Sequence, residues 1–498
     1  MPHISPGSHL PRIPHIPHLP ILRAGKAYRS LSTKVLDNLA TGEPVAEISQ
    51  ANSGLIAKDL AEIGRARHDL ESLTTRELVA ISKKAGELFA TTDLPLGGAT
   101  QSADDYVVQT SATTGLPQVM VRANMAKIRF VLEEMETVLG GLTRGLDLEI
   151  LDRGFGTQDG RMVSYRRETD ALGAVLPSNS PGVHSLWLPA IPLKTALVLR
   201  PGSREPWTPL RIAQAFIAAG CPESAFHYYP SDHAGAQQIL LRTRRSMLYG
   251  DRATVDPWRS NPGVQIHGPG WSKVVFGADA AERWPDHLDL MVASVADNGG
   301  RSCINASGIW TPSHGRAIAD AIARKFAEIE ALALDHPEAR LAAFPSRKAA
   351  ESLSHVIDSQ LAQGGAEDMT ARHRGDANRV AEAGGCWFVL PTVIFCEDPN
   401  HPLASAEYLF PFVSVVEVPQ DELLHKMGPS LVVTGLTEDP NFRRELLTAT
   451  NVERLNLGAS GARGAGAAIP TSKIAWDQPH EGNLFEHLYR QRSFQGVA

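Results

Sequence analysis

The chain of 498 residues contains only four cysteines, at positions 221, 303, 386 and 396. No two of them form a Cys-x-x-Cys pair, so the spacing predicts neither a zinc knuckle nor a disulfide framework. Few cysteines are typical of a reducing compartment, and we expect a cytoplasmic protein. The sequence also lacks an apolar run of about 18 residues, the length that a membrane-spanning helix needs.

An excess of positive charge is absent as well. Lys and Arg together number 48 and Asp and Glu 55, which gives a net charge of −7. Proteins that bind the phosphate backbone need a basic surface, so we expect no nucleic-acid partner. About 43% of the residues are hydrophobic, which is enough to build cores in the two or three domains that this length predicts.

The first 23 residues alternate proline, histidine and aliphatic side chains. Because proline fixes φ and removes a backbone donor, this composition predicts an extended, poorly packed arm over 1–23. Four histidines of the arm could bind a metal ion, but an arm lying on the surface or on a partner is the simpler interpretation, and we predict no metal site. These histidines are His3, His9, His15 and His18.

Helical periodicity dominates from about Ala24 to Gly145, where apolar residues recur at spacings of three and four. Thr74 with Glu77 three residues later is typical of a helix start. Two alternating runs around the stretch FGTQD then predict a β-hairpin over 148–168.

An α/β pattern follows this hairpin. One helix is expected to begin with Thr208 as N-cap and Pro209 at its first position. Strands that alternate with helices at this spacing predict a doubly wound parallel sheet, which binds ligands at the carboxyl ends of its strands. The expected strands are 171–177, 195–201, 226–230 and 246–251.

From residue 272 the alternation resumes, as a second α/β domain would require. Near the C-terminus, RQRSFQGV could add a strand to a sheet edge or to a neighbouring subunit. The apolar run SLWLPAIPL, residues 185–193, could line a pocket for an aliphatic or aromatic group, although such runs are more often core.

The stretch DNGGRSCINASG, residues 297–308, places Cys303 in a glycine-rich loop. A thiolate attacks a carbonyl, so the pKa of the thiol must be lowered by positive charge or by N–H groups that point at sulfur. Gly299 and Gly300 let the backbone approach closely, and Arg301 could add positive charge. Cys303 is therefore a candidate nucleophile, with a small buried hydrophobe as the alternative; the other cysteines lie in apolar runs and are expected in the core.

Several segments together resemble the aldehyde dehydrogenase superfamily. The family's Gly-Gln-x-Cys loop matches 300–303, and its Pro-Trp-Asn motif, whose amide holds an oxyanion, matches PSNSP with Asn179. Its Lys-Pro-Ser-Glu, Phe-Thr-Gly-Ser and Glu-Glu-Ile-Phe-Gly-Pro-Val segments match RPGSREPWTP, MLYGDRAT and AEYLFPFV. Order and separations agree from about Ala24 to the C-terminus, and so cover nearly the whole chain.

The resemblance implies a three-part α/β fold and an oligomer, either a homodimer or a homotetramer. A doubly wound nucleotide-binding domain would comprise 24–147 and 169–271. A small β oligomerisation flap would comprise 148–168 and 470–498, and an α/β catalytic domain 272–469.

The resemblance also implies NAD or NADP as cofactor. Arg200 stands where the family has a lysine, and Ser203 replaces a glutamate that repels a 2′-phosphate. Loss of that negative charge, with Arg204 nearby, would ease binding of NADP. NAD remains the alternative cofactor. Tyr408 replaces the glutamate that holds the nicotinamide ribose. The residues at matching cofactor positions are Ser178, Arg200, Ser203, Gly250, Asp251, Glu407 and Phe410.

His267 stands nearest to the position of the family's general base, a glutamate that activates water. Its imidazole could act as a base or merely fill a loop position. Members without the glutamate include CoA-acylating dehydrogenases and acyl-CoA reductases, and 176–206 is similar to the luminescence fatty acyl-CoA reductases of bacteria.

We therefore predict that Cys303 attacks a small-molecule aldehyde or acyl thioester, while Asn179 and the Cys303 backbone N–H hold the oxyanion. The favoured reaction is reduction of an acyl-CoA to an aldehyde, or its reverse, with coenzyme A as co-substrate. Oxidation of an aldehyde to an acid, with His267 or another group activating water, remains open. So does a nucleotide-binding homologue that has lost catalysis.

Overall fold

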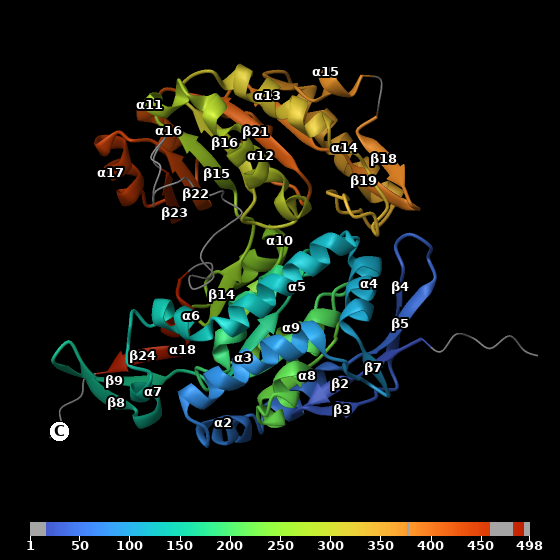
Figure 1. Cartoon of the computed structure of the whole chain (residues 1–498), viewed down its shortest axis with the longest axis vertical. Helices are drawn as coiled ribbons and strands as arrows, with labels where there is room; N and C mark the ends of the chain where they lie inside the picture. Colours follow the sequence, from blue (N-terminus) through green and yellow to red (C-terminus); the bar gives the residue numbers. More distant parts are fainter. Residues whose placement is uncertain (1–15, 376–377, 459–481, 493–498) are drawn as a thin grey trace, which may run out of the picture.

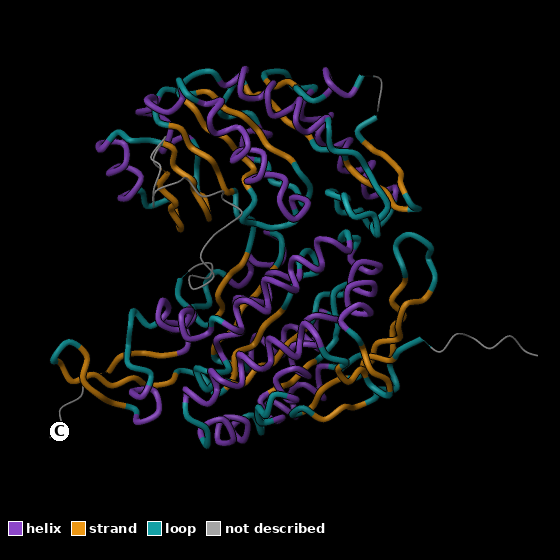
Figure 2. The backbone as a smooth tube through the Cα atoms, viewed as in Figure 1, coloured by secondary structure: helices purple, strands orange, loops and turns teal. Residues whose placement is uncertain are grey.

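The computed structural model describes residues 16–375, 378–458 and 482–492. Two seven-stranded sheets form the two halves of the molecule, and a three-stranded sheet projects from the half that contains the N-terminal part of the chain (Figure 1). Helices pack beside the strands of both large sheets (Figure 2). This is the α/β architecture that the strand and helix alternation predicted.

The first large sheet has the order β14-β13-β10-β11-β12-β2-β3. Strands β14 to β12 run parallel, and β2 and β3 pair antiparallel at the edge. Chain order reverses between β10 and β13, so a crevice is expected at their carboxyl ends. The strands are β2 Ile21–Arg23, β3 Lys26–Tyr28, β10 Ala171–Val175, β11 Ala196–Arg200, β12 Phe226–Tyr228, β13 Arg245–Tyr249 and β14 Val264–His267.

The second large sheet has the order β17-β20-β21-β16-β15-β22-β23. Its pairs are parallel except that of β17 with β20. The alternation expected after residue 272 is thus confirmed. The strands are β15 Ser272–Phe276, β16 Ala306–Thr311, β17 Ala366–Asp368, β20 Thr392–Cys396, β21 Phe412–Glu417, β22 Ser430–Leu436 and β23 Val452–Gly458.

The three-stranded sheet, which we call the flap, consists of β8 (Phe155–Gln158), β9 (Arg161–Arg167) and β24 (Tyr489–Arg492). The predicted hairpin exists, but its first expected strand is instead helix α7, Glu149–Arg153. Gly154, at φ 80°, ends this helix, and the hairpin turns at Asp159 and Gly160. Strand β24 pairs with β9 of the same chain; residues 470–481 and 493–498 of the predicted flap lie outside the described residues.

The prediction of helices from Ala24 onward is wrong for the first part of that range. Strands β3, β4 (Thr33–Asp37) and β5 (Pro44–Ser49) precede the first helix, and β5 pairs with β1, His18–Leu19. Residues 18–23 also bury Leu19, Ile21 and Leu22, so they pack more tightly than the predicted arm. Pairing in the hairpins β2–β3 and β4–β5, together with the pairing of β2 with β12, overrides the local helical spacing here.

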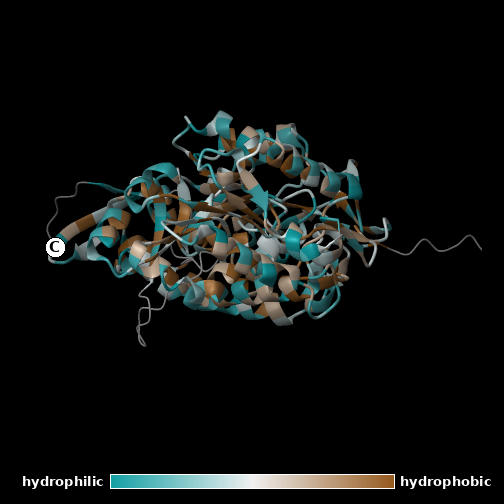
Figure 3. Ribbon diagram, turned by 90° about the horizontal axis from the view of Figure 1, so that it is seen from above, coloured by the Kyte–Doolittle hydropathy of each residue, from teal (hydrophilic) through white to brown (hydrophobic). Residues whose placement is uncertain are grey.

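Amphipathic helices cover the sheets, and alternating hydrophilic and hydrophobic colours along them are visible in Figure 3. Helix α3 begins at the predicted capping box of Thr74 and Glu77. The N-terminal helices are α1 Ser53–Leu60, α2 Gly64–Glu71, α3 Thr75–Thr91, α4 Ala103–Thr114, α5 Gln118–Glu133, α6 Met135–Leu142, α8 Trp207–Ala218, α9 His233–Arg242 and α10 Arg252–Val255.

The remaining helices flank the second large sheet or the flap. They are α11 Ala278–Ala281, α12 Leu288–Ala296, α13 Gly315–Ala327, α14 Arg347–Leu361, α15 Ala371–Arg374, α16 Gln420–Lys426, α17 Pro440–Thr448 and α18 Leu484–Leu488. Two short hairpins pair β6 (Leu94–Leu96) with β7 (Ala99–Gln101), and β18 (Val380–Ala383) with β19 (Cys386–Val389). No helix within the described ranges is long and apolar enough to cross a membrane.

Helix α8 begins two residues earlier than predicted, at Trp207 and not at Pro209. Thr208 is inside the helix, and its backbone N–H and hydroxyl both donate to the Glu205 carboxylate, at 2.9 and 2.7 Å. The buried Glu205 also contacts His184 Nε2 at 2.7 Å. A side chain that precedes the helix therefore satisfies its first donors.

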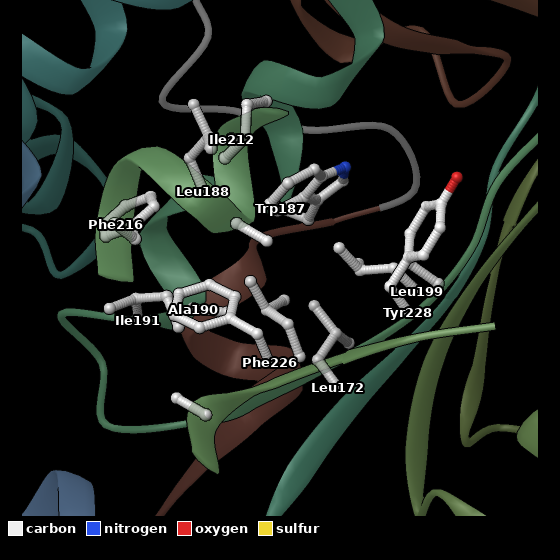
Figure 4. Packing of buried hydrophobic residues seen from close by; sticks show 14 of the residues in the cluster. Leu172, Trp187, Leu188, Ala190, Ile191, Leu199, Ile212, Phe216, Phe226 and Tyr228 are labelled. Carbon is white, nitrogen blue, oxygen red and sulfur yellow. The ribbon is translucent and has the colours of Figure 1, made fainter. Parts of the chain in front are cut away.

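Large apolar side chains fill the space between α8 and the first sheet (Figure 4). Trp187, Leu188 and Ile191 of the 185–193 run belong to this core and are fully buried. The core interpretation therefore holds for most of the run, whereas Ser185 and Leu186 at its start line a cavity, as the pocket interpretation expected. Cys221, Cys386 and Cys396 are also buried, as expected.

Candidate active site

Cys303 lies in the loop between α12 and β16. Asn298, Gly299 and Gly300 all have positive φ, at 54°, 65° and 66°. A Cβ on Gly300 would stand 2.4 Å from the carbonyl carbon of Phe410, so glycine is required there both by φ and by space. The predicted close approach of this backbone is confirmed.

Two cavities meet at this loop. The larger, about 1150 Å³, lies at the carboxyl ends of β10, β11, β13 and β14. The smaller, about 450 Å³, lies against α5 and the loop of Cys303. Asn179, Val183 and Cys303 line both cavities. A molecule in one cavity and a molecule in the other could therefore both reach the sulfur.

Asn179 follows β10 and reaches across to the cysteine loop. Its Nδ2 donates a hydrogen bond of 2.6 Å to the backbone carbonyl of Arg301. An amide nitrogen carries two hydrogens, so one remains for a ligand. The structure brings Asn179 and Cys303 together at the junction of the cavities, as the motif comparison predicted.

The pKa of the Cys303 thiol is raised to about 12, chiefly because the group is withdrawn from water and secondly because the Glu407 carboxylate is near. The backbone N–H groups of Cys303 and Ile304, together with Lys127, lower it less strongly. The expectation of a depressed pKa in the resting protein is therefore wrong.

The expected contribution of Arg301 to the cysteine's field is also wrong. Its guanidinium points away from the sulfur, donates to the carbonyl of Ala343 and lies 5.8 Å from the centroid of the Phe344 ring. Burial lowers the pKa of Arg301 to about 10. Its functional contact is through its carbonyl, with Asn179.

Asn298 connects the cysteine loop to two other segments. Its Oδ1 accepts from Asn124 of α5 at 2.8 Å, and its Nδ2 donates to Ser180 at 2.9 Å and to Ser302 at 3.2 Å. Asparagine tolerates the left-handed conformation better than most residues. These hydrogen bonds hold the cysteine loop in place. No local sequence pattern predicts that these residues contact one another.

Six of the seven residues matched to cofactor positions line the larger cavity, and Phe410 does not. Phe410 is 2% exposed and packs among the rings of Phe344, Tyr408 and Phe412, while the adjacent Tyr408 reaches the cavity. The residues that line it are Ser178, Arg200, Ser203, Gly250, Asp251 and Glu407.

Arg200 and Asp251 both form hydrogen bonds within the protein. Arg200 donates from Nε and Nη2 to the carbonyl of Ser231, at 3.2 and 3.0 Å. Asp251 caps α10 by accepting from the backbone N–H and hydroxyl of Thr254, at 2.9 and 2.7 Å, and these bonds lower the pKa of its carboxyl. Its negative charge would repel a phosphate placed close to it.

Glu407 and His267 stand on the side of the larger cavity near the sulfur. The Glu407 carboxylate accepts from the backbone N–H groups of Gly270, at 3.0 Å, and Trp271; withdrawal from water nevertheless raises its pKa to about 7. The His267 ring stacks on Tyr249, with centroids 4.2 Å apart. His267 is buried at the end of β14, so it fills a structural position whatever its chemical role.

The larger cavity fits a nicotinamide dinucleotide. Guanidinium groups suit phosphates, and the lining offers those of Arg200 and Arg204. Ala236 and Leu240 of α9 with Val175 form an apolar wall against which a base could lie. The position at a chain-order reversal of a parallel sheet is where such ligands bind.

Lys127 of α5 is the one lysine in the lining of the smaller cavity, as far as the described residues show. Sequence reasoning missed it, because the helix that carries it is far from the cysteine loop in sequence and its charge resembles that of any surface lysine. Only the fold brings it beside Cys303.

Comparisons with known proteins identify the family and the fold. The model of the aldehyde dehydrogenase family matches residues 29–427. A betaine aldehyde dehydrogenase of Vibrio vulnificus (strain YJ016) is 24% identical over 406 residues, which are 76% of each chain.

Solved structures show the same fold. A putative aldehyde dehydrogenase from Burkholderia cenocepacia superposes with a TM-score of 0.72 at 15% identity, over 96% of both chains. The NAD+ complex of an aldehyde dehydrogenase from Bacillus cereus also gives 0.72, at 16% identity, over 95% of this chain and 96% of that one. Since the family model spans most of the sequence, the chain belongs to the aldehyde dehydrogenase family.

Proposed function

We propose that this chain is an NAD(P)-dependent oxidoreductase in which Cys303 carries the substrate covalently, and that it reduces an acyl-CoA to an aldehyde or catalyses the reverse. The observation that supports this proposal is the junction of two cavities at Cys303 and Asn179. In the motif comparison an imidazole, His267, stands nearest to the position of the family's water-activating glutamate, and the lack of a carboxylate there favours transfer of the acyl group to a thiol.

In the thioester direction, the Cys303 thiol gives up its proton and its sulfur attacks the carbonyl carbon. The bond from that carbon to the sulfur of coenzyme A breaks, and coenzyme A leaves as the thiol. The Asn179 amide donates to the developing oxyanion in both this step and the next. When bound, the nicotinamide would supply one hydride to the carbonyl carbon. The bond from that carbon to the Cys303 sulfur then breaks, the aldehyde leaves and the sulfur takes up a proton, so that acyl-CoA, NAD(P)H and a proton become aldehyde, coenzyme A and NAD(P)+.

The proton of Cys303 needs an acceptor, because a thiol with a pKa of about 12 is mostly protonated near neutral pH. The Glu407 carboxylate, whose charge acts on the sulfur, is the base that the structure offers. A pKa of about 7 lets it accept and return a proton near neutrality.

Oxidation of an aldehyde to a carboxylic acid is the second candidate function, and the same carboxylate favours it. Glu407 could activate a water molecule in place of the missing glutamate, since it lines the larger cavity with Cys303. The two candidates share every step up to the acyl-cysteine and differ only in what removes the acyl group.

A panel of acyl-CoAs with NADH or NADPH tests the proposal through the loss of reduced-nicotinamide absorbance. We expect turnover by the wild-type protein and none by Cys303→Ser, whose fold is checked by its thermal transition. Aldehydes that yield free acid without coenzyme A, together with no turnover of any thioester, would establish the second candidate instead. No reaction with either class would indicate a homologue without catalysis.

We also propose that the chain forms a homodimer or homotetramer through the flap. Among the described residues, β8 is the outer strand of β24-β9-β8, and the outer strand of a sheet can pair with a strand of another copy. Light scattering measured beside a variant with proline at Thr157, in β8, tests this proposal, which a smaller assembly for the variant would support.

A further inference from the structure

Lys127 occupies an unusual position in the smaller cavity. It lies on α5, and its side chain lines the cavity together with Asn179 and Cys303. Its aliphatic stem packs over Gly182, since a Cβ built on that glycine would stand 3.6 Å from Lys127 Cδ. Within the described part of the chain, its amine forms no hydrogen bond and no ion pair.

Among the residues that the structure describes, no carboxylate is near enough to raise the pKa of this amine. Withdrawal from water lowers the pKa of Lys127, and the one group that opposes this effect is the Cys303 thiolate. Cys303 is mostly a neutral thiol at rest. An ammonium group removed from water without a partner is costly, and a bound anion would relieve that cost.

The polar neighbours of Lys127 are engaged with one another. Asn124 donates to Asn298, and Asn298 donates to Ser180 and Ser302. Asp297 is the other charged residue of the lining. These contacts hold the cysteine loop and α5 together, and Lys127 is the group of this cluster that remains for a ligand.

We infer that Lys127 binds the carboxylate of a substrate that is anionic at the end opposite its reacting carbonyl. The substrate class is a short aldehyde with a terminal carboxylate, or the corresponding monothioester of a dicarboxylic acid. This inference rests on the proposed function, because attack by Cys303 fixes where the carbonyl carbon lies. The substrate is short, because the cavity measures about 450 Å³ and Lys127 is close enough to Cys303 to lower the pKa of its thiol.

Paired substrates test the assignment by turnover. The probes are 4-oxobutanoate and butanal, which have equal carbon counts and differ in the terminal charge. We expect a lower KM for 4-oxobutanoate in the wild type, and Lys127→Met should raise that KM about ten- to hundredfold while the KM for butanal stays within about twofold. Lys127→Arg should keep most of the preference, because it keeps the charge.

Arg122→Gln is the matched control. It removes one positive charge from the same helix, but Arg122 is exposed, pairs with Asp104 at 2.8 Å and does not line the cavity. Its KM values should equal those of the wild type. Equal KM values for both aldehydes in the wild type, or equal changes for both in Lys127→Met, would overturn the assignment.

A second measurement needs no cofactor. Iodoacetate and iodoacetamide both alkylate a cysteine by displacement of iodide, and only iodoacetate is anionic. The ratio of their rates at Cys303, followed by mass spectrometry at one fixed pH, should fall at least about fivefold in Lys127→Met. An equal fall with both reagents would mean that Lys127 acts only on the thiol, which would refute anion binding.

The two measurements separate this inference from the proposed function. Slow alkylation by both reagents, with no turnover of any aldehyde or thioester, would refute the proposal that Cys303 is the nucleophile. The assignment of Lys127 would then be refuted as well. Turnover of uncharged substrates without a preference for the carboxylate would remove only the assignment of Lys127.

Discussion

The Asn179 amide donates a 2.6 Å hydrogen bond to the carbonyl of Arg301, two residues before the nucleophile candidate Cys303. This bond joins the end of β10 in the first sheet to the loop that precedes β16 in the second. It fixes the direction of the amide and leaves one of its hydrogens for the substrate oxygen. In the proposed mechanism, the same side chain therefore connects the two sheets and stabilises the oxyanion.

Asn179→Ala should lower kcat about 10²- to 10³-fold, as loss of an oxyanion donor does in other acyl-transfer enzymes. Asn179→Asp, which has nearly the same shape but no amide hydrogens, should lose as much. Steady-state kinetics with the best substrate of the panel measure both. A change in KM alone, with kcat retained, would show that Asn179 binds the substrate without stabilising the oxyanion.

The sequence predicted those strands and helix ends whose determining residues are close together in the chain. The strands β10 to β13 are short apolar runs between turn residues, and the capping box of α3 lies within four residues. The strands β3 to β5 were missed although β2 pairs with β3, and β4 with β5, in hairpins of neighbouring residues. Both hairpins are anchored to more distant segments, since Leu22 of β2 pairs with Tyr228 of β12 and His18 of β1 pairs with Glu47 of β5. A window of a dozen residues does not contain these anchoring pairs.

The residues of the candidate site also divide into those that local sequence motifs identify and those that only the fold identifies. Asn179 and Cys303 lie in motifs that the sequence displays, and the fold brings them together. The pKa of Cys303 was mispredicted because it depends mainly on withdrawal of the thiol from water. Arg301 was expected to lower that pKa by its positive charge, but its guanidinium donates to the carbonyl of Ala343 instead. Lys127 and Asn298 gain their roles only from contacts between segments that are remote in sequence.

Glu407 should make stability depend on pH. Its pKa rises from 4.5 to about 7 on folding, so between those values the folded chain keeps a proton that the unfolded chain has lost. Raising the pH through this window therefore favours unfolding, by up to about 3 kcal/mol in total. Denaturant unfolding from pH 4.5 to 7 should show a smaller decline for Glu407→Gln. Parallel curves for both proteins would contradict the assignment.

Gly300→Ala should disrupt the cysteine loop. The new Cβ would stand 2.4 Å from the Phe410 carbonyl carbon, at a φ of 66° that alanine rarely adopts. We expect loss of activity and a fall in the free energy of unfolding of several kcal/mol. Gly145→Ala is the control, because its φ is 77° but nothing lies within 4 Å of its Cβ. Equal losses in the two variants would show that strain alone, without the contact to Phe410, accounts for the effect.

Ser203→Glu should shift cofactor preference toward NAD. Ser203 and Arg204 line the larger cavity near Arg200, so a carboxylate there would offset the positive charge that suits a 2′-phosphate. We expect kcat/KM for NADP to fall about tenfold relative to NAD, which corresponds to roughly 1.4 kcal/mol. Ser203→Gln, which matches the glutamate in size and carries no charge, should leave the ratio near that of the wild type. If both variants change the ratio equally, the bulk of the side chain is responsible, and the ribose of the cofactor does not lie where the family resemblance predicts it.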